Sequence, residues 1–218
     1  MPTPGFPADT LDEDGTPVWI TDLASEHPNH TVHVVRDLSP QDALLALGAK
    51  PALITSCELP AERPDEWTSL ARAAIGPTDS GAVLLAGRVG DWTFVYDDGG
   101  LTGFTLDGDT PATLLSATGR EAATSTFSIN ADTNLEYAVD GESLFAVYEE
   151  LDPTADEEEE IPAALRDAVE AAGTFDQEDL DEGEPDGAIN LRVLCALAGL
   201  RCTLDDLRRI PLWAAPFS

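Results

Sequence analysis

Apolar positions alternate with polar ones in several short stretches of this 218-residue chain, and elsewhere they recur at helical spacing. Residues 31–36 are β-branched and largely apolar, which predicts a strand with one well-buried face. Further strands are expected at 52–56, 81–89, 92–97, 101–105, 124–129, 134–139 and 143–149. Glycine-containing turns at 90–91, 98–100 and 140–141 separate neighbouring strands, so antiparallel hairpins are the predicted arrangement.

Helices are predicted where a capping hydroxyl precedes an apolar stripe. Ser39-Pro40 and Thr110-Pro111 both place proline at the first helical position, and Gly48 and Gly119 end these helices. The first of them should bury Leu44, Leu45 and Leu47. Other helices are expected at 65–75, 162–172 and 189–200, with a short one capped by Thr203. The predicted fold class is therefore α+β, an antiparallel sheet with helices mainly on one face.

The chain divides by composition into four parts. With 43% hydrophobic residues it can build a real core as one sizeable domain. We expect an acidic, proline-rich N-terminal segment (1–16), an α+β core (17–151), an acidic arm with one short helix (152–186), and C-terminal helices that pack on the core (187–218).

The net charge of −31 limits what the protein can bind. Such a surface repels nucleic-acid phosphates and anionic lipids and attracts cations and basic proteins. A basic protein is therefore the expected partner, with no direct binding of nucleic acid or membranes. Ten of the eleven basic residues are arginine, and Ala, Gly, Pro and Asp are abundant, which is typical of a GC-rich genome. Adaptation to salt is thus a second explanation of the acidity.

The acidic arm carries 15 Asp and Glu residues and a single base, Arg166. Like charges packed this closely repel one another and bury little apolar surface. The arm is interpreted as a solvated linker, with a partner-binding strip and loose binding of divalent cations as alternatives. Asn130 and Asp132 hold a turn or contribute to recognition. The candidate protein-binding residues are Asp156, Glu157, Glu158, Glu159, Glu160, Asp179, Asp181, Glu182, Asn130 and Asp132.

No residues are assigned to catalysis, to a cofactor or to a metal. His27, His30 and His33 are spaced by three, but in an extended chain His30 and His33 lie on opposite faces. The sequence contains no nucleophile elbow, phosphate loop, zinc-protease motif or dinucleotide fingerprint. Three cysteines without a CxxC pair argue against a disulfide framework, and the tryptophans are interpreted as core or edge anchors.

Two helices near the C-terminus imitate a helix-turn-helix. A DNA-reading module needs a basic face, and only Arg192, Arg201, Arg208 and Arg209 are available there. Helices that pack on the core are the favoured interpretation.

Two segments are distinctive, residues 34–49, VVRDLSPQDALLALGA, and residues 128–133, SINADT, which a strand pair follows. Both resemble a family of uncharacterised actinobacterial proteins. The segment 202–207, CTLDDL, is similar to the end of that family, although Cys202 stands where the family has leucine. The resemblance spans about 17–150 and 188–207 and implies one shared fold. It implies no activity and no catalytic residue.

The expected function is the non-catalytic binding of a basic protein. The concrete form is an immunity or inhibitor protein that neutralises or regulates its partner, because acidic inhibitors gain association rate from electrostatic steering. The alternatives are a DNA mimic or defence-related regulator that occupies a nucleic-acid-binding site, and an enzyme of unknown type. The N-terminus has no basic segment followed by an apolar one, so a cytoplasmic location is expected.

Overall fold

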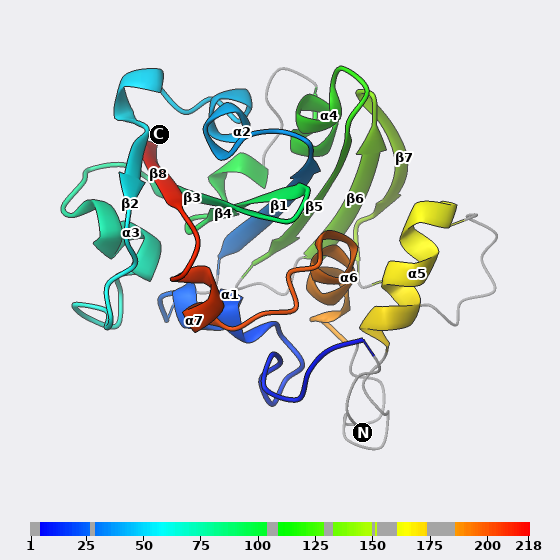
Figure 1. Cartoon of the computed structure of the whole chain (residues 1–218), viewed down its shortest axis with the longest axis horizontal. Coiled ribbons are helices and arrows are strands. Elements are labelled where there is room, and N and C mark those ends of the chain that lie inside the picture. Colours follow the sequence, from blue (N-terminus) through cyan, green and yellow to red (C-terminus); the bar gives the residue numbers. More distant parts are fainter. Residues whose placement is uncertain are drawn as a thin grey trace.

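An eight-stranded antiparallel sheet forms the centre of the protein, as seen in a computed structural model (Figure 1). The structure describes residues 5–26, 29–103, 109–128, 133–149, 151, 161–173 and 186–218. Across the sheet the strands are β2 (Thr55–Cys57), β8 (Leu212–Phe217), β3 (Ala82–Val89), β4 (Trp92–Asp97), β1 (His30–Arg36), β5 (Glu121–Phe127), β6 (Thr133–Val139) and β7 (Glu142–Val147).

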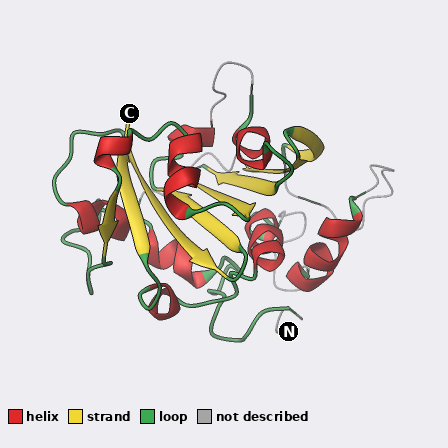
Figure 2. Ribbon diagram, turned by 45° about the horizontal axis from the view of Figure 1, so that its top comes forward, coloured by secondary structure: helices red, strands yellow, loops and turns green. Residues whose placement is uncertain are grey.

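Helices cover both faces of the sheet, and more of them lie on one face than on the other (Figure 2). The helices are α1 (Val18–Leu23), α2 (Pro40–Ala46), α3 (Leu70–Ile75), α4 (Pro111–Ser116), α5 (Ala163–Ala172), α6 (Ile189–Ala198) and α7 (Leu204–Leu207). Helices α2 and α4 cover a smaller apolar core, and the other five belong to the larger one. The α+β class and the uneven distribution of helices are as predicted from the sequence.

Local capping chemistry fixes the helix ends that the sequence predicts. The Ser39 side chain accepts the backbone N–H of Asp42, and Thr110 forms a capping box with Thr113. Gly48 and Gly119 follow these helices with φ of 94° and 81°. The prediction for the first apolar stripe is partly wrong, because Leu44 and Leu47 are fully buried while Leu45 is 39% exposed.

The hairpin between β6 and β7 is confirmed. Asp140 and Gly141 both have positive φ, 51° and 80°, as a tight turn between right-twisted strands requires. The prediction of a strand at 101–105 is wrong for the residues that the structure describes there, 101–103. Leu101–Gly103 is a 3₁₀ turn, because the buried Asp97 carboxylate accepts the backbone N–H groups of Gly99 and Thr102 and winds the chain back.

Two other predicted elements are shorter in the structure. A 3₁₀ turn at Pro51–Leu53 replaces the start of the strand expected at 52–56. The helix expected from residue 65 begins only after Ser69, whose hydroxyl accepts the N–H of Arg72. Asp65 instead accepts the N–H of Trp67, which holds the preceding segment in a turn.

The C-terminal part holds an unpredicted strand beside the predicted helices. Helices α6 and α7 occur where the sequence indicates them, but β8 then enters the sheet between β2 and β3. Gly87 of β3 allows this close packing, since a Cβ there would lie 2.7 Å from the Phe94 ring and 2.8 Å from Leu212.

Candidate functional site

The structure does not place the binding residues predicted from the sequence. All ten of them, at 130, 132, 156–160, 179, 181 and 182, lie outside the described residues. Their role therefore stays a prediction.

His30 and His33 lie on opposite faces of β1, as the period of two predicts. His30 stacks on Phe127 at a centroid distance of 5.8 Å on the side of the larger core. His33 contacts Thr102 and Thr124 on the other side. In the described ranges no three His, Cys, Asp or Glu side chains come together as a metal site. His27 lies outside these ranges, so the expectation that the histidines bind no metal stays a prediction.

A fully buried polar chain runs through His33. The Thr102 hydroxyl donates to Asp97 Oδ2 at 2.6 Å, so its oxygen is left to accept from His33 Nε2 at 2.8 Å. The neutral ring then carries its proton on Nε2, and Nδ1 accepts from the Thr124 hydroxyl at 3.0 Å. Each group in the chain has a partner with a matching role. This arrangement stabilises the sheet. Because His33 is fully buried, no substrate can contact its ring.

His30 is buried in a different way. Its two ring nitrogens have no hydrogen-bond partner in the described part of the chain, and Tyr96 and Phe127 pack against the ring. Burial lowers the pKa of His30 to about 4 and that of His33 to about 3. Burial also raises the pKa of Asp97 above its usual value. Both histidines are therefore neutral at physiological pH.

Acidification should cost stability through His30. Its folded pKa of about 4 lies below the unfolded value of 6.5, so the unfolded chain takes up the proton first. Stability is lost as pH falls from about 6.5 to 4, whereas Asp97, with a raised pKa, contributes with the opposite sign. We expect the stability of the wild type relative to His30→Phe to fall over this window, measured by urea unfolding. A difference that stays constant with pH contradicts the buried, neutral His30.

The three cysteines are thiols without nucleophilic character. Burial raises the pKa of Cys57 to about 11 and that of Cys202 to about 12, and it raises the pKa of Cys195 further. All three are free of disulfide bonds. Because the thiolate is the reactive form, these groups do not favour covalent catalysis.

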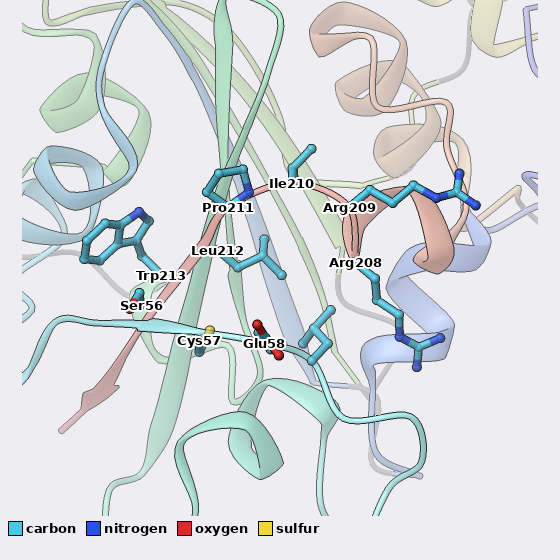
Figure 3. Close-up of a pocket in the computed structure, with 10 residues that line it drawn as sticks. Ser56, Cys57, Glu58, Arg208, Arg209, Ile210, Pro211, Leu212 and Trp213 are labelled. Carbon is cyan, nitrogen blue, oxygen red and sulfur yellow. The ribbon is translucent and has the colours of Figure 1, made fainter.

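A cavity of about 610 Å³ opens between the segment 56–59 and the segment 208–213 (Figure 3). Cys57 and the two arginines Arg208 and Arg209 are among its lining residues. The guanidinium of Arg208 bonds to Asp205 and to the carbonyl oxygens of Pro60 and Ala61, and that of Arg209 bonds to Asp206. The thiol is protonated and both guanidinium groups are already bonded, which leaves the Ser56 hydroxyl and the Glu58 carboxylate as the other candidate groups of the lining. Neither of them is paired with a second group among the described residues, so the cavity shows no assembled catalytic arrangement.

The α6–α7 pair packs on the core, in agreement with the favoured interpretation. Every residue of α6 from Ile189 to Ala196 is buried. Arg192, which a DNA-reading helix would need on its surface, is fully buried and pairs with Asp186. Its guanidinium also donates to carbonyl oxygens of Gly15 and Ala172. These helices therefore present no basic face to DNA.

The fold and the buried chemistry define an α+β protein built on one antiparallel sheet. A family model matches residues 17–209, and the chain belongs to that family, which is described as a family of unknown function (DUF6461). No curated protein and no solved structure matches the chain. The family carries no catalytic assignment. None of the helices within the described ranges combines the length and apolar character needed to cross a membrane.

Proposed function

We propose that this protein binds a basic protein and catalyses no reaction. The concrete form is an immunity or inhibitor protein that neutralises or regulates its partner. In the described part of the chain the histidines are buried and neutral, and the thiols are protonated. These groups, which most often carry catalysis near neutral pH, are thus not poised for it.

The observation that carries the proposal is the state of the arginines. All ten lie in the described residues, and each already bonds within the chain. Within the described ranges six of them pair with six different carboxylates, namely Arg36, Arg72, Arg88, Arg192, Arg208 and Arg209. The other four donate to backbone carbonyl oxygens, through Arg63, Arg120, Arg166 and Arg201.

Few cationic groups are therefore left to neutralise the remaining carboxylates. Among the described residues six ion pairs use six carboxylates, whereas the whole chain has 42 Asp and Glu residues and only Lys50 as a basic residue besides the arginines. A field of this sign accelerates the encounter with a positively charged protein and suppresses contact with acidic ones. The acidic runs at 156–160 and 176–184 add to this field on the evidence of the sequence.

Capture with the immobilised chain tests the proposal. We expect the retained proteins to be basic and to elute as the salt concentration rises, because screening weakens long-range attraction. The purified partner should then form a complex of defined stoichiometry in calorimetry. A matched column carrying an unrelated protein of similar net charge removes proteins that bind any polyanion.

Two outcomes bear on the alternatives. A retained nucleic-acid-binding protein that competing DNA displaces would favour the DNA mimic over the immunity protein. Retention of acidic proteins alone, or retention indifferent to salt, would contradict the proposal.

A further inference from the structure

A second cavity, of about 800 Å³, lies between the loop 58–69 and helix α3. Its apolar walls come from three prolines, with Ala73 and Gly76 of the α3 end. Three exposed carboxylates, Glu62, Asp65 and Asp79, also line it. We call this cavity the α3 groove, defined by its lining residues Pro60, Glu62, Pro64, Asp65, Thr68, Arg72, Ala73, Gly76, Pro77, Thr78 and Asp79.

The one basic residue in the α3 groove is already neutralised. Arg72 donates from Nε and Nη2 to the two oxygens of Asp98, both at 3.2 Å. It also donates to the carbonyl oxygens of Ser80 and Gly81. The Asp98 side chain is only 2% exposed, so Arg72 is paired with a buried carboxylate. The groove therefore presents three carboxylates that no guanidinium within it opposes.

The loop that forms one wall is fixed in place before any ligand arrives. Arg208 holds the carbonyl oxygens of Pro60 and Ala61, although it lies 148 residues from Pro60 in the sequence. Arg63 donates to the carbonyl oxygen of Ala24, and the N–H of Glu26 donates to that of Glu66. Because these hydrogen bonds already fix the loop at several points, binding a ligand costs little conformational entropy for ordering it.

The same loop presents a large aromatic surface. Trp67 is 58% exposed, and its backbone N–H donates to the carboxylate of Asp65 in the groove. Tryptophan is enriched among the residues that carry binding energy in interfaces, and its ring attracts guanidinium and ammonium groups. An exposed indole on an acidic loop suits a cationic side chain with an apolar stem.

We infer that the α3 groove receives an arginine or lysine side chain from the basic partner. This inference rests on the proposed function and names the surface that performs it. The apolar walls accommodate the stem of that side chain, Glu62, Asp65 and Asp79 face its charge, and Trp67 adds contact area on the same loop. The long-range field brings the partner close, and the α3 groove sets how long it stays.

Two triple variants with the same change of charge test the inference. The groove variant carries Glu62→Gln, Asp65→Asn and Asp79→Asn. The control carries Glu142→Gln, Asp167→Asn and Glu170→Gln, which are exposed positions on β7 and α5, at the opposite end of the molecule from α3 (Figure 1). The probe is a tetra-arginine amide, followed by NMR shifts of backbone amides and of the tryptophan indoles.

We expect saturable shifts at residues 60–79 and at the Trp67 indole in the wild type and the control. The groove variant should bind the peptide about tenfold more weakly, and Trp67→Ala should weaken it in the same direction. Equal affinities for the two triple variants, or shifts spread over the whole acidic surface, would overturn the inference.

The partner captured by the chain separates this inference from the proposed function. The groove variant should release that partner about tenfold faster than the control does. If both variants release a basic partner at the same rate, the groove assignment fails and the proposed function stands. If the peptide binds in the groove but no basic protein is captured, the proposed function fails.

Discussion

Replacing Arg192 with methionine is expected to lower the free energy of unfolding by about 3–5 kcal/mol. The guanidinium is fully buried and connects α6 to three other parts of the chain. It pairs with Asp186 and donates to the carbonyl oxygens of Gly15, Ala172 and Gly173. Methionine fills similar space but leaves the Asp186 carboxylate, only 12% exposed, without this cation. Urea unfolding followed by circular dichroism measures the loss.

Arg209→Met is the matched control for this prediction. That side chain is 74% exposed and pairs with Asp206 one helical turn away. An exposed pair of this kind contributes only about 0.3–0.5 kcal/mol. Similar losses for the two variants would show that Arg192 is not the internal connector that its contacts indicate.

The second large effect is expected at His33. Phenylalanine there leaves the buried Thr124 hydroxyl without its acceptor and the Thr102 oxygen without its donor. Since an unsatisfied buried polar group costs about 1–3 kcal/mol, we expect His33→Phe to destabilise by about 2–3 kcal/mol. Thermal and urea unfolding at neutral pH measure this change.

His30→Phe provides the comparison on the same strand. The His30 nitrogens have no hydrogen-bond partner among the described residues, and its ring already packs against Tyr96 and Phe127. Phenylalanine keeps these ring contacts and removes the unsatisfied nitrogens, so stability should change by less than about 1 kcal/mol or increase. A loss at His30 as large as that at His33 would contradict the difference between the two sites.

The elements that the sequence predicts well are those with local causes. The β6–β7 hairpin follows from Asp140-Gly141, and α2 and α4 follow from hydroxyl caps beside proline. In each case the determining hydrogen bonds or dihedral angles lie within a few residues of one another. Such interactions are visible in a linear reading of the chain.

Strand β8 is an element that local sequence patterns do not predict. Proline is rare inside sheets, so Pro216 argues against a strand at 212–217. The structure accommodates it because β2 pairs with β8 only from Leu212 to Ala214. Beyond Ala214 strand β8 has β3 as its one described neighbour, and proline needs no donor on the free side.

The candidate site was less predictable than the fold. The α3 groove depends on Arg208 reaching the 60–61 backbone and on Arg72 pairing with Asp98. Neither contact has a sequence spacing that would reveal it. From the sequence the tryptophans are interpreted as core or edge anchors, which Trp19 confirms, whereas Trp67 is 58% exposed. The full burial of Arg192 is likewise a result of tertiary packing.

The most direct test of the central claim is the association rate of the protein with its captured partner in rising salt. The comparison uses the intact chain and a variant whose runs at 156–160 and 176–184 carry Asn and Gln in place of Asp and Glu. We expect the association rate of the intact chain to fall steeply with salt. The neutralised variant should associate about tenfold more slowly at low salt, with a shallower dependence and little change in dissociation. An association rate indifferent to both salt and neutralisation would contradict electrostatic capture of a basic partner.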